Sequence, residues 1–229
     1  EEWFGIGVTR DGCMAEYVLS PDQNVFNTSG LGPKIACYME PLSCVIHGIQ
    51  KASIRMTDRV LLAGAGPIGL LLLQAAQTLG AGMIDVVERN PSRRSVAADL
   101  GADQTFESFD ELEVDRYDVV IDATGAIPVL EKLIQFSRFG GTMLFFGVAP
   151  SGEMMKIEPF QIFKKGLTIV SSYTSLRKSL QAVELLRSGA IKVDTLTSHI
   201  VGLDDMERGI GLLETGSDGV MKVIIDPTI

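Results

Sequence analysis

The chain has 229 residues, 46% of them hydrophobic, and a formal net charge of −9 from 20 basic and 29 acidic side chains. This length corresponds to one or two domains with ample material for a buried core. The acidic balance and the scattered Lys and Arg residues argue against a nucleic-acid or anionic-membrane surface, and no apolar stretch of about 18 residues predicts a membrane span. Three cysteines form neither a disulfide framework nor a Cys-x-x-Cys pair, so we expect a soluble, cytoplasmic protein.

The first 50 residues predict a short strand and an interrupted helix. Residues 13–20 are β-prone and end at a Pro-Asp turn. Pro33 is a typical helix start, and Pro41 must kink or restart that helix. The restart would place Glu40 at the N-terminal edge of a helix.

From Val60 the chain alternates apolar strands with amphipathic helices. Strands are predicted over 60–63, 83–88, 104–106, 118–122, 142–147 and 167–172, and helices over 67–79, 92–100 and 127–136. This alternation is typical of a parallel sheet covered on both faces, which is a doubly wound α/β fold of the Rossmann type. Ligands of such sheets bind at the carboxyl ends of the strands.

Beyond Tyr173 the pattern changes. It predicts a helix over 176–186, a strand over 196–201, a helix opened by the capping-box-like Asp204-x-x-Glu207, and a last strand over 220–225. We therefore divide the chain into residues 1–50, a nucleotide domain over 51–175, and a return segment over 176–229.

The turn between the first strand and helix of the nucleotide domain reads Gly64-Ala65-Gly66-Pro67-Ile68-Gly69. Gly64 lets the chain turn sharply, Gly66 leaves room for a pyrophosphate against the backbone, and Gly69 lets the helix approach the sheet. The helix then starts with free N–H groups and a positive dipole end. A glycine pattern alone is weak, but with a strand before it and a helix after it we predict a dinucleotide site in which Pro67 and Ile68 open the helix.

Glu88 follows Gly69 by 19 residues and ends the second strand. A carboxylate there accepts hydrogen bonds from both ribose hydroxyls of an adenosine and repels a 2′-phosphate, which favours NAD over NADP. The neighbouring Arg89 keeps NADP open, because an Arg beside the ribose can bind that phosphate.

Five segments resemble the medium-chain, zinc-dependent alcohol dehydrogenase family, and most closely its sorbitol-type polyol branch. They are Asp11-Gly12-x-x-Ala15-Glu16-Tyr17-Val18, Glu40-Pro41-Leu42-Ser43 with His47, the glycine turn, Asp122-Ala123-Thr124-Gly125, and Met221-Lys222-Val223-Ile224. The similarity covers essentially the whole chain. It implies an oxidoreductase that transfers a hydride between NAD and a polyol or secondary alcohol with the help of Zn²⁺. It also implies that both chain ends belong to a β-rich, GroES-like catalytic domain that flanks the Rossmann sheet.

The resemblance assigns roles to further residues. Glu40 would lie beside the zinc, as a ligand or through water, and Cys44 beside the nicotinamide. Arg93 would lie over the adenine and Lys222 near the pyrophosphate, while Thr124, Phe146, Gly147 and Val148 would hold the nicotinamide ribose and carboxamide. From the residues alone, Glu40, Arg93 and Lys222 also fit ordinary solvated side chains, and Asp122 fits a simple strand end.

The chain also departs from the family pattern. The upstream Cys and His-Glu zinc ligands and the four-cysteine structural zinc lobe have no counterpart, and the chain begins with Glu, so we expect a longer gene that carries them. Thr174-Ser175 stands where the sorbitol-type site has an Arg-Tyr pair, which leaves the identity of the alcohol open.

The remaining expectations concern assembly and isolated side chains. The strand over 167–172 would be an edge strand able to pair across a two-fold axis, so we expect a homo-oligomer, either a dimer or a tetramer. His47 and His199 are expected to be structural, and Cys13 and Cys37 to be small buried hydrophobes.

Two alternative functions stay open. One is a zinc-free quinone or enoyl reductase of the same superfamily, against which Glu40 and the NAD preference of Glu88 count. The other is an NAD-binding module without chemistry of its own.

Overall fold

The computed structural model describes residues 5–175, 177–216 and 219–229. Its centre is a parallel sheet of six strands in the order β3-β2-β1-β4-β5-β6. The strands are β1 (Arg59–Ala63), β2 (Met83–Val87), β3 (Gln104–Phe106), β4 (Tyr117–Asp122), β5 (Ser137–Phe145) and β6 (Thr168–Ser171). The sequence predicted all six strands, and this order is that of a doubly wound nucleotide-binding sheet.

Helices cover both faces of the sheet. Alternate residues of β1 belong to two separate apolar clusters, with Val60 and Leu62 on one face and Leu61 and Ala63 on the other. The first face is covered by α2 (Met39–Ala52), α3 (Pro67–Thr78) and α4 (Pro91–Asp99), and the second by α5 (Ile127–Leu133). Because both faces are buried, the strands read as continuous apolar runs.

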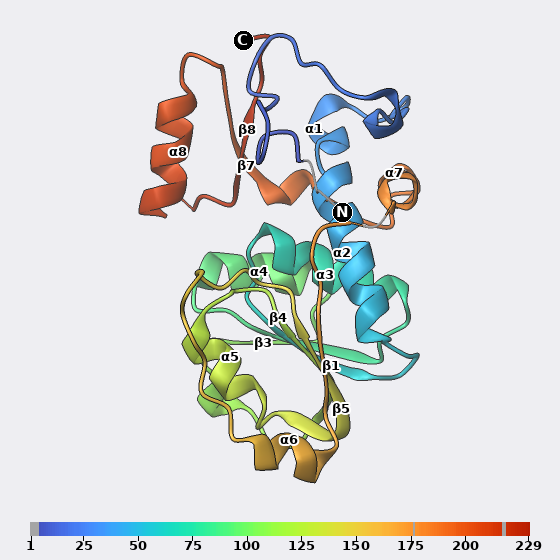
Figure 1. Ribbon diagram of the computed structural model, residues 1–229, viewed down its shortest axis with the longest axis vertical. Helices are drawn as coiled ribbons and strands as arrows, with labels where there is room; N and C mark the ends of the chain where they lie inside the picture. The colour runs from blue at the N-terminus through green and yellow to red at the C-terminus, as the bar shows by residue number, and fades with distance from the viewer. Residues whose placement is uncertain (1–4, 176, 217–218) are drawn as a thin grey trace.

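The two ends of the chain form a second body beside the sheet (Figure 1). It contains α1 (Pro33–Ala36), α7 (Ser179–Arg187), α8 (Met206–Thr215), and the two-stranded parallel sheet of β7 (Thr197–Val201) and β8 (Lys222–Ile225). Figure 1 shows α2 running from this body to the flank of the large sheet. Short 3₁₀ turns lie at Asp22–Asn24, Phe109–Glu111 and Asp194–Leu196.

Pro41 restarts the early helix as predicted. The first helix ends at Ala36 and α2 begins at Met39, so Pro41 is the third residue of α2 and Glu40 the second. Proline is tolerated there because the first N–H groups of a helix have no partner within the helix. Glu40 therefore lies at the N-terminal edge of α2, as expected.

Other predictions were wrong. Residues 13–20 form no strand, and Tyr17 and Leu19 are 90% and 96% exposed, because among the described residues no strand pairs with this stretch. The helix α6 (Pro159–Lys165) was missed, although Pro159 at its first position and Gly166 in a left-handed conformation after its end are both helix-boundary signals.

Element boundaries also shifted. The helix α5 ends at Leu133 rather than residue 136, because its last turn tightens into i→i−3 bonds, such as Phe136 N–H to the Leu133 carbonyl at 3.1 Å. The helix α7 starts at Ser179; Leu176, where its start was predicted, lies outside the described residues. The capping box at Asp204 does not form, because α8 begins at Met206 and the side chain of Asp205 at its N-cap makes no capping bond.

No helix in residues 5–175, 177–216 and 219–229 has the length and apolar character needed to cross a bilayer. The three-part division of the chain remains a prediction.

Candidate functional site

The glycine turn after β1 has the geometry that a bound phosphate requires. Gly64 has φ +98°, and a β-carbon on Gly69 would lie 2.0 Å from the Gly64 carbonyl oxygen. A β-carbon on Gly66 would meet no atom within 4 Å, and no side chain caps the start of α3. The first amides of α3 therefore face an open space that the backbone of Gly66 borders, which suits a pyrophosphate.

Glu88 closes the other side of this space. It is half-buried at the end of β2, and its carboxylate accepts hydrogen bonds from the main-chain amides of Ala65 at 2.9 Å and Asn90 at 2.8 Å. The first bond ties the strand end to the glycine turn. A carboxylate has about four acceptor positions, so acceptors remain for a ligand hydroxyl.

The start of α4 lies next to Glu88. The Asn90 side chain caps this helix by accepting hydrogen bonds from the amides of Ser92 and Arg93 at 2.9 and 3.1 Å. Sequence reasoning missed this cap, although Asn followed by Pro is a typical helix start. Arg89 is exposed beside it, so its side chain is free to approach a ribose substituent.

Arg93 and Lys222 contact parts of the protein itself. The Arg93 guanidinium donates a hydrogen bond to the Val220 carbonyl at 3.0 Å, which links α4 to the chain just before β8. The Lys222 ammonium lies 5.6 Å from the centre of the Tyr38 ring, a cation–π distance. Their contacts with adenine and pyrophosphate stay predictions.

The loops after β4 and β5 lie beside the glycine turn. The methyl group of Thr124 packs against Gly64, because a β-carbon there would lie 2.9 Å from it. Phe146 packs against α2, where a β-carbon on Gly48 would lie 2.6 Å from its ring, and Val148 is 92% exposed. The structure thus brings Thr124, Phe146, Gly147 and Val148 to the same end of the sheet as the glycine turn.

Glu40 and Cys44 form a pair one turn apart on α2. Glu40 is exposed, and the Cys44 thiol donates a hydrogen bond to its carboxylate at 3.4 Å. Burial, with the Glu40 charge and this bond, raises the pKa of Cys44 to about 12. Within the described part of the chain, no group of three or more His, Cys, Asp or Glu side chains could hold a metal ion. A zinc site needs three or four protein ligands, so this pair alone does not fit one.

The other His and Cys residues are placed as follows. His47 is 8% exposed inside α2, and its pKa is lowered by burial and then by the charges of Lys51 and Lys178. His199 shares a hydrogen bond of 2.9 Å with Ser198 in β7. Cys13 and Cys37 are exposed, which contradicts the expectation that they are buried. Cys13 lies in the stretch that forms no strand, and the Cys37 thiol bonds the Lys34 carbonyl in the link between α1 and α2.

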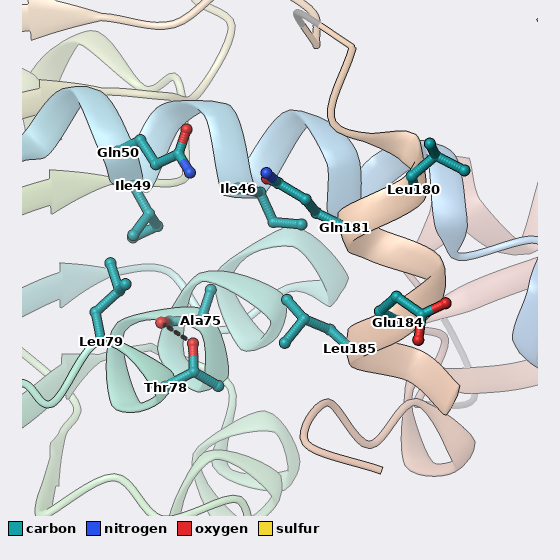
Figure 2. Close-up of a pocket in the computed structure, with 10 residues that line it drawn as sticks. All are labelled: Ile46, Ile49, Gln50, Ala75, Thr78, Leu79, Leu180, Gln181, Glu184 and Leu185. Atoms are coloured by element: carbon teal, nitrogen blue, oxygen red, sulfur yellow. Dashed lines mark hydrogen bonds between the residues drawn. The ribbon is translucent and has the colours of Figure 1, made fainter. Parts of the chain in front are cut away.

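A separate apolar hollow of about 540 Å³ lies between α2, α3 and α7 (Figure 2). Ile46, Ile49, Leu79 and Leu185 point into it. It borders the C-terminal end of α3, whereas the glycine turn precedes the other end of this 12-residue helix, roughly 15–18 Å away. The hollow is therefore distinct from the carboxyl ends of the strands, where the dinucleotide is expected.

The parallel sheet order, the glycine turn and the acid at the end of β2 together define a dinucleotide-binding Rossmann domain. The profile of the family described as zinc-binding dehydrogenase matches residues 67–188, more than half of the chain. The chain belongs to this zinc-binding dehydrogenase family, which confirms the resemblance found in the sequence.

Two relatives and two solved structures illustrate the similarity. D-altritol 5-dehydrogenase of Agrobacterium fabrum is 34% identical over 87% of this chain and 61% of its own length. D-arabinitol dehydrogenase 1 of Uromyces fabae is 28% identical over 96% of this chain and 66% of its own length. A crystal structure from Sinorhizobium meliloti 1021, described as a zinc-binding dehydrogenase bound to NADP, has a TM-score of 0.91 and 31% identity, covering 97% of this chain and 68% of that one.

The second structure is an alcohol dehydrogenase from Escherichia coli CFT073 complexed with NADH. It has a TM-score of 0.89 and 25% identity, covering 96% of this chain and 67% of that one. The chain thus spans 61% and 66% of the lengths of the two relatives named above. A nicotinamide dinucleotide is the shared cofactor class of the two solved structures.

Proposed function

We propose that this chain is the cofactor-binding portion of an NAD-dependent, zinc-type polyol or secondary-alcohol dehydrogenase. The observation that carries the proposal is Glu88, whose carboxylate lies at the end of β2 and is bonded to the glycine turn through Ala65. Together with the open space above Gly66, it provides acceptors for a ribose next to a site for a pyrophosphate.

The preference for NAD over NADP rests on charge. The two neighbouring structures contain NADP and NADH, so the family as such admits both cofactors. The two backbone hydrogen bonds hold the Glu88 carboxylate at the strand end, where a 2′-phosphate would meet its negative charge. Free ribose hydroxyls would instead donate hydrogen bonds to it. Arg89 is the residue that would support NADP.

The substrate class is supported by the names of the relatives, which are a D-altritol and a D-arabinitol dehydrogenase. When bound, the nicotinamide supplies the hydride acceptor or donor. For this chain we propose the loops around Thr124 and Phe146–Val148 as the nicotinamide side of the crevice. The particular alcohol stays open.

The metal is proposed for the whole protein. Glu40 would supply at most one ligand, because only Cys44 lies beside it among the described candidate ligands. We place the other ligands in the part of the relatives that this chain does not span, and we derive no step of the reaction from a metal held here. Retained activity of the whole protein in a chelator would favour the zinc-free reductase instead.

We also propose a homo-oligomer. The strand β6 lies at the edge of the sheet with β5 as its neighbour, and α6 beside it exposes Phe160 and Phe163 to 58% and 81%. An edge strand near exposed apolar side chains is a typical surface for pairing with a second copy. Equilibrium sedimentation of the chain tests this, and a monomer throughout would contradict it.

The cofactor proposal is tested by titrating the chain with NADH and with NADPH while following the fluorescence of the reduced nicotinamide. We expect saturable NADH binding at least about tenfold tighter than NADPH binding, which corresponds to about 1.4 kcal/mol. Glu88→Ala should remove this preference. The matched control is Glu113→Ala, which removes an equal charge from an exposed carboxylate paired with Arg116 before β4 and should leave the preference unchanged.

Three results would count against the proposal. Binding of neither cofactor would contradict the dinucleotide site. A preference for NADPH that Arg89→Ala abolishes would assign NADP. A preference for NADH that survives Glu88→Ala would show that Glu88 does not select the cofactor.

A further inference from the structure

We propose that Asp122, the last residue of β4, is the positioning residue for the nicotinamide half of the cofactor. The inference rests on the proposed NAD-binding function and deepens it. Asp122 needs no contact with the cofactor for this role, because it acts through the two loops that would hold the nicotinamide and its ribose.

The Asp122 carboxylate is completely buried and fixes the loop after β4. One oxygen accepts hydrogen bonds from the Thr124 amide at 2.9 Å and the Thr124 hydroxyl at 2.6 Å, and the other accepts one from the Gly125 amide at 3.0 Å. Three donors on two adjacent residues therefore converge on one side chain, and these bonds hold the loop against Asp122.

The same residue fixes the loop after β5. The Asp122 carbonyl oxygen accepts hydrogen bonds from the amides of Phe146 at 3.1 Å and Gly147 at 2.9 Å. A β-carbon on Gly147 would lie 2.5 Å from the carboxylate and 2.1 Å from the Gly125 nitrogen. The two loops thus meet without an intervening side chain, and Asp122 bonds both of them.

Asp122 also determines where the Thr124 hydroxyl donates its hydrogen. Its proton is donated to Asp122, and its oxygen accepts a hydrogen bond from the Ala126 amide at 3.1 Å. A hydroxyl oxygen has two acceptor positions, so one remains. Thr124 is exposed and can therefore offer an acceptor, and not a donor, to a ribose hydroxyl.

The charge of Asp122 is balanced by these donors. Among residues 5–175, 177–216 and 219–229, no Lys, Arg or His side chain forms an ion pair with it. A buried carboxylate without a cation depends on its hydrogen bonds, and three bonds to donors satisfy it. Asparagine has the same shape but would place an NH₂ group against one of the N–H or O–H donors. Asp122→Asn should therefore loosen the loop after β4 without creating a cavity, while the main-chain bonds from Phe146 and Gly147 to the Asp122 carbonyl remain.

The experiment compares two ligands on the chain: NADH, which reaches both halves of the crevice, and ADP-ribose, which lacks the nicotinamide. Isothermal titration gives both dissociation constants, and NADH fluorescence reports the immobilisation of the nicotinamide ring. For Asp122→Asn we expect NADH binding to weaken about tenfold or more and its fluorescence enhancement to fall, while ADP-ribose binding changes less than about twofold.

Three further variants make the result specific. Asp85→Asn removes another fully buried carboxylate of the same sheet, one bonded to the Tyr117 hydroxyl, and should leave both ligands unaffected. Thr124→Val keeps the shape of Thr124 but removes its hydroxyl, so it should weaken NADH selectively even if Asp122→Asn fails to fold. Thr124→Ser keeps the hydroxyl and, unlike Thr124→Val, should bind NADH as tightly as the unmodified chain.

The outcomes separate the two proposals. If the unmodified chain binds ADP-ribose and NADH but Asp122→Asn and Thr124→Val leave the ratio of the two affinities unchanged, the role of Asp122 is refuted and the NAD site stands. Equal weakening of both ligands would show a merely structural residue and also refute it. Binding of neither ligand to the unmodified chain would overturn the NAD site and this inference together.

Discussion

Gly69, in the first turn of α3, lies directly against Gly64: a β-carbon on Gly69 would be 2.0 Å from the Gly64 carbonyl oxygen. No real β-carbon is accommodated at that distance, so the helix and the strand end approach as closely as they do only because this residue is glycine. Gly66, between them in sequence, has the opposite surroundings, with no atom within 4 Å of its β-position. The same motif therefore contains one glycine needed for the fold and one that borders the open space where we propose that the pyrophosphate binds.

Alanine substitution should separate these two roles. Gly66→Ala is compatible with the backbone, which has φ −69° and ψ 177°, and should leave thermal unfolding almost unchanged. Its methyl group would occupy the phosphate space, so loss of one or two charge-assisted hydrogen bonds, about 1.5–3 kcal/mol each, should weaken NADH binding more than about tenfold. Gly69→Ala should instead destabilise the fold by about 3 kcal/mol through overpacking. Thermal melts and NADH titrations of both variants check this, and normal NADH binding by Gly66→Ala would contradict it.

The sequence allowed prediction of most of the sheet and of the glycine turn because their signals are local. The apolar runs of β1, β2 and β4 and the helix between Pro67 and Thr78 were predicted to within one residue at each end. The position of Glu88 followed from chain distance alone. The strand over 13–20 failed for a related reason: its composition is β-prone, but strand formation depends on a partner that no local pattern can supply.

The partners of the site residues could not be predicted, because they lie far away in the chain. Arg93 and Val220 are separated by 127 residues, yet one donates a hydrogen bond to the other. Asp122 was interpreted as a possible strand end, and its buried position between two loops depends on Phe146 and Gly147. Side-chain direction and long-range pairing are tertiary properties that period and spacing do not encode.

Lys165, the last residue of α6, should be among the most important polar residues for stability. Its ammonium donates hydrogen bonds to the carbonyls of Ile134, Gln135 and Ser137 at 2.9, 3.1 and 3.0 Å, and it is 7% exposed. Lys165→Met would leave these carbonyls without their donor. We therefore expect the free energy of unfolding to fall by about 3 kcal/mol and the melting temperature to fall by roughly 6–12 °C. Differential scanning calorimetry measures both.

The matched control is a substitution of Asp115, the ion-pair partner of Lys165. Asp115 lies 2.6 Å from the ammonium but is 45% exposed, and exposed ion pairs contribute about 0–1 kcal/mol. Its φ of +56° is also well tolerated by asparagine. Asp115→Asn should therefore cost less than about 1 kcal/mol. If it destabilised the chain as much as Lys165→Met, the main contribution of Lys165 to stability would come from its ion pair with Asp115 and not from its hydrogen bonds to the three carbonyls.

Asp85, in the middle of β2, should make stability depend on pH. Burial raises its pKa, against the hydrogen bond from Tyr117 and the charge of Arg116, which lower it, so the folded state binds the proton more tightly than the unfolded state. Protonation of Asp85 therefore contributes fully to the stability of the fold below about pH 4, and this contribution is lost as the pH rises through the raised pKa. Where Asp85 ionises, its charge is buried with one carboxylate oxygen that has no hydrogen-bond partner among the described residues.

Asp85→Asn removes this charge while an amide oxygen can still accept the Tyr117 hydroxyl. We expect the variant to be more stable than the unmodified chain at pH 7 by about 1 kcal/mol, or roughly 2–4 °C, and to lose that advantage near pH 4. Thermal melts across this range measure the difference. If the stability difference between the variant and the unmodified chain became less favourable to the variant on going from pH 4 to pH 7, the ionised carboxylate would be satisfied in the fold.

Cys44 should react slowly with alkylating agents because it is half-buried beside the Glu40 carboxylate. Burial raises its pKa to about 12, with the Glu40 carboxylate adding to the shift, and only the thiolate reacts. At pH 8 we therefore expect iodoacetamide to modify the exposed Cys13 at least about tenfold faster than Cys44. The Cys44 rate should still increase about tenfold per pH unit up to pH 10, because that pH remains below the pKa.

Glu40→Gln removes the negative charge that disfavours the Cys44 thiolate, so it should accelerate the labelling of Cys44, while burial keeps that rate below the rate of Cys13. Glu153→Gln, in an exposed loop, should change neither rate. Peptide mass spectrometry after timed labelling measures each cysteine separately, and Cys44 labelling that matches Cys13 at pH 8, or that Glu40→Gln leaves unchanged, would show that the carboxylate does not hold the thiol protonated.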